Sequence, residues 1–268
     1  MLSLTKLLAA LTAGFVVSGS AFAAAMVPGF DSHTVVSTEQ VISYETIGFP
    51  IFAANPEDVV SNNIYIARRG FMALSISVQS GTQVYMDLFP FLDDLNGYGG
   101  TVTYGTGTYD GNTAFGVNWI DISPNPNWVD TYGNTYTGSE RNNFQLILVD
   151  RSHDVGRGAG DFDIIFNYDS IQWDMEGPDF VGFSMLVNNV PDQSERLYSP
   201  GFSEYPGYFH DGEPNALASN SLNSNVAGRY VFEVHNPIPE PETWAMLLAG
   251  LGIMGAVTRR QRTKVATM

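Results

Sequence analysis

The chain has 268 residues, of which 44% are hydrophobic and 13% aromatic, which is enough apolar material for one sizeable core and argues against wholesale disorder. It contains no cysteine, so disulfides, thiolate metal sites and a cysteine nucleophile are excluded. The net charge of -16 disfavours nucleic acid as a partner, because an acidic surface repels a polyanion. Much of the basic charge lies at the two ends of the chain, which leaves the body between them more acidic still.

Residues 1–25 have the pattern of a secretory signal peptide. Lys6 supplies the positive start, Leu7 to Val17 form an apolar stretch, and the small residues Ala21 and Ala23 form an A-x-A cleavage site. The small-residue ending argues against the alternative, a buried N-terminal helix. We therefore expect a signal helix, the general secretion machinery as a partner, and a mature body from about residue 26.

The upstream half of the body contains several stretches that are typical of β-strands. Val35 to Tyr44 and Ile64 to Val78 are strand-like, with a polar loop at Asn55 to Asn63 between them and a turn at residues 67–70. Short alternating stretches follow at residues 101–104 and 115–119, and a turn-rich piece covers residues 123–140.

The strongest alternation lies between Asn142 and Asp174. Phe144, Leu146 and Leu148 share one face of a first strand, and Phe162, Ile164, Phe166 and Tyr168 share one face of a second. The opposite face of the second strand carries acids, which predicts that this face is wet. A glycine-containing loop at residues 151–160 joins the strands, and a shift of phase near Asp169-Ser170 predicts a bulge.

Two further strands close the body. They are expected at Phe180 to Val187 and Gly228 to Val234, with a long polar loop from Asn188 to Ser224 between them. Many short strands with turn residues between them predict a mostly β protein. We expect residues 26–236 to form a single antiparallel, sandwich-like β domain.

Several of these stretches resemble the nidogen-like (NIDO) domain. They are FQLILVDRS, GDFDIIFNYDSIQW, MDLFPFLDDLNGYGGTVTYG, FGVNW and GRYVFEV, and they place the core of the resemblance at about residues 45–235. The stretch around Ala67-Arg68-Arg69-Gly70 resembles the family's upstream strand-turn-strand, without the family's N-N-G-type turn. The resemblance implies cell adhesion or cell-matrix adhesion outside the cell, and it brings no catalytic residues.

The C-terminal segment has three parts. Residues 237–242 form a proline-rich linker, and residues 243–268 contain a short apolar stretch from Trp244 to Val257 followed by Arg259, Arg260 and Arg262. This pattern predicts a transmembrane helix with Trp244 and the arginines at its two interfaces and the body outside the cytoplasm. The alternative to a sorting signal is a plain single-pass anchor.

The order P-E-P, apolar helix and arginine cluster resembles the PEP-CTERM sorting signal of Gram-negative bacteria. The resemblance implies that Pro239, Glu240 and Pro241 are recognised by an exosortase. The chain would be held transiently in the inner membrane and then reach the cell surface or the extracellular matrix of a biofilm.

No nucleophile elbow, zinc-protease helix or phosphate-binding loop occurs in the sequence. Carboxylates near glycines make weak calcium candidates, although solvated acidic turns are the simpler interpretation; they are Asp93, Asp94, Asp150, Asp161 and Asp163. No other cofactor is expected. Loop aromatics could stack on sugars or plug the ends of the sandwich; they are Trp128, Tyr132, Tyr136, Tyr205, Tyr208 and Phe209.

We therefore expect a non-catalytic, surface-sorted adhesion or matrix protein that binds extracellular polysaccharide or another surface protein. Two alternatives stay open. One is an exported polysaccharide-active hydrolase that uses paired carboxylates, and the other is a purely structural component of the biofilm matrix. A carboxylate pair in a deep cleft would favour the hydrolase, whereas a flat, aromatic-dotted acidic face would favour binding.

Overall fold

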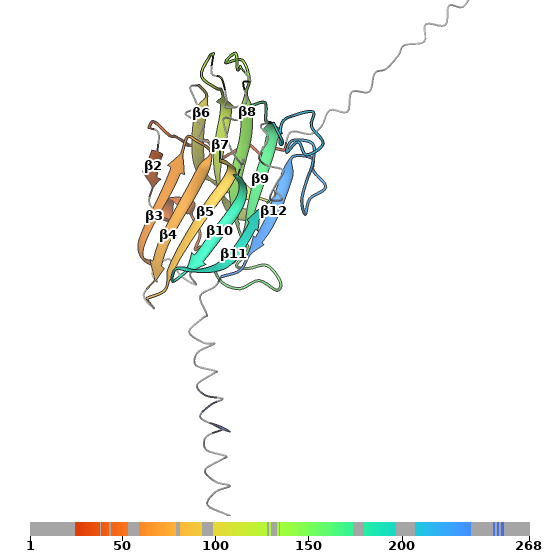
Figure 1. Ribbon diagram of the computed structural model, residues 1–268. Helices are drawn as coiled ribbons and strands as arrows, with labels where there is room; N and C mark the ends of the chain where they lie inside the picture. Colours follow the sequence, from red (N-terminus) through yellow and green to blue (C-terminus); the bar gives the residue numbers. More distant parts are fainter. Residues whose placement is uncertain are drawn as a thin grey trace, which may run out of the picture.

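The computed structural model describes residues 25–37, 39–42, 44–52, 59–78, 81–92, 99–127, 129, 133, 135–173, 180–196 and 207–236, together with Ala249, Leu251, Ile253 and Met254. Two antiparallel sheets of six strands pack face to face (Figure 1). The prediction of a mostly β, sandwich-like body is confirmed. Both predicted terminal helices lie almost entirely outside the described residues.

Sheet A has the strand order β1-β6-β7-β8-β9-β12. Its strands are β1 (His33–Thr34), β6 (Thr101–Tyr109), β7 (Asn112–Ile122), β8 (Asn142–Asp150), β9 (Phe162–Ser170) and β12 (Arg229–Val234). Asp110 and Gly111 join β6 to β7, and both have positive φ, which suits the twist of a two-residue hairpin.

Sheet B has the order β11-β10-β5-β4-β3-β2. Its strands are β2 (Glu39–Ile42), β3 (Val59–Ala67), β4 (Phe71–Val78), β5 (Gln83–Leu92), β10 (Phe180–Val187) and β11 (Val190–Arg196). A single-turn 3-10 helix, η1 (Tyr44–Ile47), follows β2.

The core lies between the sheets and is rich in aromatic side chains. The rings of Trp119 and Phe144 stack with their centroids 5.1 Å apart. Trp119 also donates its indole N–H to the carbonyl of Ala67 in sheet B at 3.0 Å, and the hydroxyl of Tyr168 donates to the carbonyl of Pro90. Buried indole and phenol groups thus find partners across the core, which fixes how the two sheets face each other.

Two predicted loops contain strands. The loop expected at Asn55 to Asn63 overlaps the start of β3, and the loop expected from Asn188 to Ser224 contains β11. Asn188 and Asn189 both have positive φ, so they form a two-residue hairpin turn that returns the chain along β10. Residues 190–194 of β11 are largely exposed at the edge of sheet B, and an edge strand needs no apolar alternation, which is why its sequence gave no strand signal.

The predicted bulge is present. In the pairing of β8 with β9, Phe144 lies opposite Tyr168 and Asn143 lies opposite Ser170, so Asp169 is the extra residue. The bulge changes the phase of the strand, so that Ile171 and Trp173 return to the core. The Asp169 carboxylate accepts the N–H of Ala25, at the start of the N-terminal segment.

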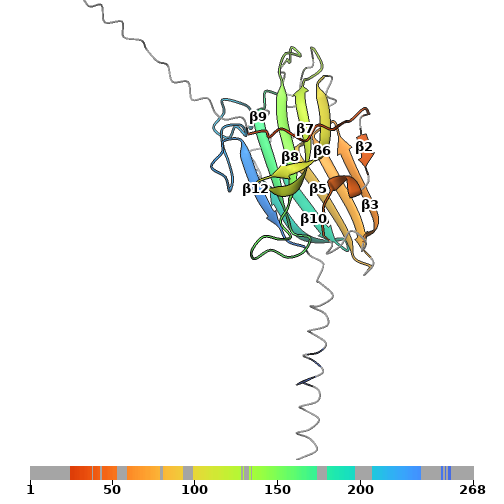
Figure 2. The ribbon, with the colours of Figure 1, turned by 180° about the vertical axis from the view of Figure 1, so that it is seen from behind.

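The prediction of a wet outer face on β9 is wrong. Asp163, Ile165 and Asn167 are all buried. Residues 25–32 cross the outer face of sheet A before β1 joins its edge (Figure 2), and Arg151 and Arg157 cover Asp163. We call residues 25–32 the strap. Its Phe30 packs in a small cluster with Ala114, Ile147, Val149 and Ile165, and a Cβ at Gly116 would lie 2.4 Å from Phe30 Cγ. A glycine on β7 therefore makes the socket for the Phe30 ring.

A row of buried polar side chains runs across sheet A beneath the strap. Gln145 joins Asn118 at 2.6 Å to Asn167 at 2.8 Å, and Asn167 accepts a hydrogen bond from Arg229. Gln145 also bonds both the N–H and the carbonyl of Val27. Because each amide in the row is paired, polar side chains can be buried on this face without the cost of an unsatisfied group.

Candidate functional site

The loop between β8 and β9 is a compact structure built from consecutive turns. Arg157 N–H donates to Asp154 O at 3.1 Å, and Asp161 N–H donates to Gly158 O at 3.1 Å. Gly156 and Gly160 adopt positive φ, which lets the chain reverse within the loop. The loop expected at residues 151–160 is confirmed, and its backbone bonds set the positions of the charged side chains.

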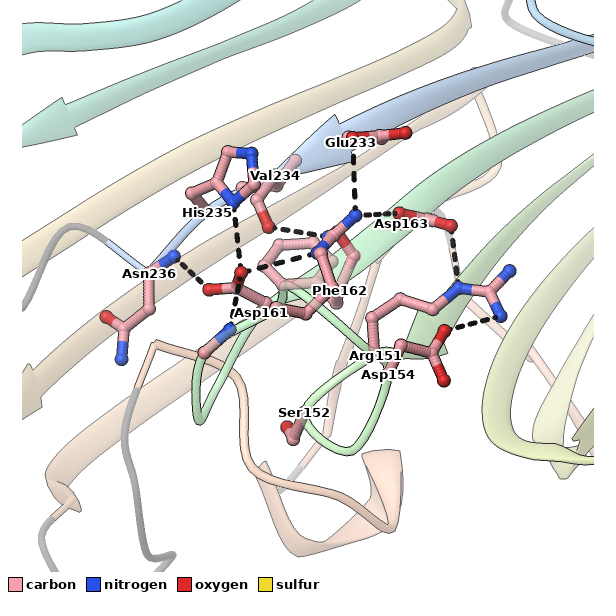
Figure 3. A network of polar contacts seen from close by, with 12 residues as sticks. Arg151, Ser152, Asp154, Asp161, Phe162, Asp163, Glu233, Val234, His235 and Asn236 are labelled. Atoms are coloured by element: carbon pink, nitrogen blue, oxygen red, sulfur yellow. Dashed lines mark hydrogen bonds and ion pairs between the residues drawn. The ribbon is translucent and has the colours of Figure 1, made fainter.

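Two arginines, three aspartates and Glu233 form an ion-pair network at this end of the sandwich (Figure 3). Asp163 lies between the arginines, with one oxygen 2.7 Å from Arg151 Nε and the other 3.0 Å from Arg157 Nη1. Arg157 Nε lies 3.3 Å from Asp161. Asp161 and Asp163 are buried, so the two arginines offset the cost of keeping these charges out of water.

The network also holds the chain where it leaves β12. Asn236 N–H donates to Asp161 Oδ1 at 2.7 Å, and the Nδ1 of His235 lies 2.9 Å from Asp161 Oδ2. The side-chain amide of Asn236 donates to Ala159 O at 2.8 Å, and Arg157 donates to Val234 O at 3.1 Å. We call loop 151–161 together with residues 234–236 the exit clamp.

Neighbouring groups set the ionisation of the clamp. Burial acts to raise the pKa of Asp161, but hydrogen bonds from the N–H groups of Asn236 and Gly158, together with His235, bring it below its ordinary value of 3.8. Burial likewise acts to lower the pKa of Arg151, yet the hydrogen bond and charge of Asp163 raise it. Both shifts favour the charged forms, so the clamp is an ion-pair structure at neutral pH.

The predicted calcium candidates of this loop have other partners. Asp161 and Asp163 are occupied by arginines and N–H donors, and Asp150 accepts the N–H of Ser152 at 2.9 Å. Asp161 and Asp163 are also not the solvated turn acids that the sequence suggested, since both are buried. Asp93 and Asp94 lie outside the described residues. Among the described residues no group of three or more metal-ligating side chains occurs.

The loop aromatics that the structure describes plug the sandwich. Tyr136 and Phe209 are buried, and Tyr208 packs against the same core with its ring edge-on to Phe209. Trp128, Tyr132 and Tyr205 lie outside the described residues. The end-plug interpretation therefore holds for the three rings that can be placed.

The remaining predicted site residues belong to the two end segments and lie outside the described residues. They are Ala21 and Ala23 of the cleavage site, Pro239, Glu240 and Pro241 of the sorting motif, and Trp244, Arg259, Arg260 and Arg262 of the membrane anchor. In the described part of the chain, no helix has the length and apolar character needed to cross a membrane.

No local pattern in the sequence predicts the exit clamp. Arg151 and Arg157 were nevertheless a usable signal, because basic residues are rare in this acidic body and both lie in a loop that leads to Asp161 and Asp163. His235 and Asn236 gave no signal. Their partner Asp161 lies more than seventy residues earlier, at a separation of 74 from His235, which no local pattern reveals.

Comparison with known proteins gives two adjoining family matches. The nidogen-like domain matches residues 99–236, and the PEP-CTERM protein-sorting motif matches residues 237–262. No curated protein and no solved structure matches the chain. The first match ends on Asn236 of the exit clamp, and the second begins at the next residue. The chain belongs to the nidogen-like domain family and carries a PEP-CTERM signal, which marks it as an exported protein sorted by an exosortase.

Proposed function

We propose that this protein is a surface or extracellular-matrix protein whose nidogen-like body is a non-catalytic binding domain, delivered there by processing of its tail. The observation that carries the proposal is the junction at residues 236 and 237. The folded sandwich holds the chain up to Asn236, and the sorting motif starts directly after it. A body that ends where the sorting signal begins is suited to be released or displayed as one folded unit.

The delivery half of the proposal states that processing of the tail brings the protein to the surface or the matrix. It is tested by intact mass and location of the protein in its native host. The wild type should lose its tail near Pro239-Glu240-Pro241 and reach the surface or the matrix. Glu240→Ala should stay full length in the membrane, whereas Glu242→Ala, two residues further on and outside the P-E-P triplet, serves as the matched control and should be processed. If the wild type stays full length in the inner membrane, the proposal fails.

The binding half of the proposal states that the body binds an extracellular ligand. The outer face of sheet B supports it. Tyr65 and Tyr85 are partly exposed and lie on either side of β4, with Tyr65 opposite Ala73 and Tyr85 opposite Ser75. Strand spacing and rise place their Cα atoms roughly 12 Å apart. Phe71 and Phe89 lie on the same face, with ring centroids 6.3 Å apart. Aromatic rings with small residues between them form a flat surface for stacking sugar rings.

Asp87 adds a polar group to the middle of this face. It lies opposite Ala73 on one side and Ser184 on the other, and burial raises its pKa. A partly buried carboxylate among aromatic rings is an acceptor for sugar hydroxyls. The acidic net charge of the chain disfavours polyanions, so we take the ligand to be an uncharged extracellular polysaccharide.

The clamp carboxylates do not suit the hydrolase alternative. A glycosidase needs one carboxylic acid that holds its proton and a second carboxylate that is free to act. Asp161 has a lowered pKa, and both Asp161 and Asp163 are held by arginines. Neither carboxylate is therefore suited to be a proton donor.

The binding half is tested with the processed protein and an uncharged polysaccharide from the host matrix, by co-sedimentation. The double variant Tyr65→Ala/Tyr85→Ala should reduce retention at least about tenfold, as expected when stacking worth ~1.4 kcal/mol or more is lost. Ile120→Ala is the matched control, because Ile120 is exposed to the same extent on sheet A. Equal retention of the double variant and the wild type would reject this face as the binding site.

A further inference from the structure

The exit clamp brings the sorting motif very close to the folded body. Asn236 is bound through both its backbone and its side chain, and only Pro237 and Ile238 separate it from Pro239. An extended chain spans at most about 3.6 Å per residue, so Pro239 lies within roughly 11 Å of Asn236. An enzyme that grips the P-E-P triplet must therefore meet the end of the sandwich.

The clamp is fastened from two sides, so the exit does not fray easily. Loop 151–161 holds residues 234–236 through Asp161, Ala159 and Arg157. On the other side Gln193 of β11 donates to His235 O at 2.7 Å and accepts the His235 N–H at 3.3 Å. Strands of both sheets thus fix the direction in which the chain leaves the body.

Loop 151–161, which binds the exit through Arg157, Ala159 and Asp161, also presents an exposed apolar side chain. Val155 is fully exposed, at 105% of its reference area, which exceeds the value of every other exposed large hydrophobic residue in the described ranges. Val155 lies within a turn closed by the hydrogen bond from Arg157 N–H to Asp154 O. Covering this side chain with a partner would remove apolar surface from water, which favours contact with a protein.

We propose that this end of the sandwich, formed by the exit clamp and Val155, is a docking surface for the exosortase that processes the tail. The clamp fixes the point at which the chain leaves the surface that the enzyme contacts, and the short connection limits how far from that surface the P-E-P triplet can lie. The sorting enzyme thus recognises the folded end of the domain as well as the tail. This proposal rests on the delivery half of the proposed function.

The test measures the rate of tail removal of the full chain in the native host by pulse-chase and intact mass. One variant inserts six Gly/Ser residues between Asn236 and Pro237, which keeps the clamp and separates it from the triplet. A second, Val155→Glu, places a charge on loop 151–161. Each should slow tail removal at least about threefold, with an unchanged melting temperature. Val36→Glu is the control, because Val36 is also an exposed valine but lies just after β1, at the edge of sheet A, and it should leave the rate unchanged.

The outcomes separate the two proposals. If Glu240→Ala blocks processing while the insertion and Val155→Glu are processed at the wild-type rate or faster, the enzyme reads the tail alone and the docking surface is rejected. If the wild type is not processed at all, the proposed delivery fails and the docking surface fails with it. Slowing by the insertion and by Val155→Glu, but not by Val36→Glu, is the result that supports docking.

Discussion

The two outer faces of the sandwich differ in solvent exposure, although the strands of both sheets show the same alternation in sequence. The outer face of sheet A is covered by the strap, with Phe30 in a glycine socket and a row of paired amides beneath it. The outer face of sheet B leaves Val41, Tyr65 and Tyr85 exposed. A strand whose outward residues are polar can therefore be buried on both faces when another segment supplies the hydrogen bonds.

The two sheets differ in what they hold and in what they leave open. Sheet A holds both ends of the body, because Ala25 N–H donates to Asp169 on β9 and Asn236 N–H donates to Asp161 just before β9. Sheet B is left with an open face that carries aromatic rings. Sheet A thus serves as the structural layer, and sheet B is the layer that we propose for ligand binding.

The largest expected effect tests whether the strap is part of the core. Phe30→Ala should lower the free energy of unfolding by about 3–5 kcal/mol, because a buried ring is lost and the socket is left empty. Tyr65→Ala on sheet B, as the control, should cost about 0.5 kcal/mol. Urea unfolding of the secreted body measures both. Equal losses for the two variants would show that the faces do not differ.

The socket at Gly116 provides a second test of how the strap packs on sheet A. Gly116→Ala should cost about 1–3 kcal/mol, because its Cβ would overlap Phe30. In the double variant Phe30→Ala/Gly116→Ala the penalty of Gly116→Ala should largely vanish, which a double-mutant cycle by urea unfolding detects. Additive losses would mean that the two residues do not share a socket.

The contributions of Asp161 and Asp87 to protein stability should depend on pH with opposite signs. Asp161 has a lowered pKa, so its contribution to stability is present above the unfolded value of 3.8 and is lost as the pH falls through its folded pKa. Asp161→Asn should therefore destabilise the protein at pH 7, with less effect in acid below pH 3.8.

Asp87 has a pKa raised by burial, so its ionisation works against folding above pH 3.8. Asp87→Asn should slightly stabilise the protein at pH 7, and the gain should disappear in acid. Melting temperatures from pH 3 to pH 7 measure both variants. Two variants that change stability with the same sign at pH 7 would contradict the assignment.

The smallest expected effect on stability concerns the open face. Tyr65→Ala/Tyr85→Ala should shift the free energy of unfolding by less than about 1 kcal/mol, since both side chains are partly exposed. The same variant is expected to lose polysaccharide retention, as proposed above. A large loss of stability, measured by thermal unfolding, would mean that these rings serve packing rather than binding.

Much of the fold could be predicted because it depends on local patterns. The two strands of the central hairpin, the loop between them and the bulge at Asp169 follow from period-two alternation and its shift of phase. The edge strand β11 could not be found in this way. It alternates too little to be recognised, and the Asn188-Asn189 turn lacks the glycine that usually marks such hairpins.

The sequence by itself determined the β class, the central hairpin, the export and sorting tail, and the family. Tertiary structure decided which faces are wet and which carboxylates are free. The strap and the clamp depend on contacts between residues far apart, such as Ala25 with Asp169 at a separation of 144 and Arg229 with Ala25 at 204. Alternation records which side chains share a face of a strand, but it does not record what covers that face, because the covering segment comes from elsewhere in the chain.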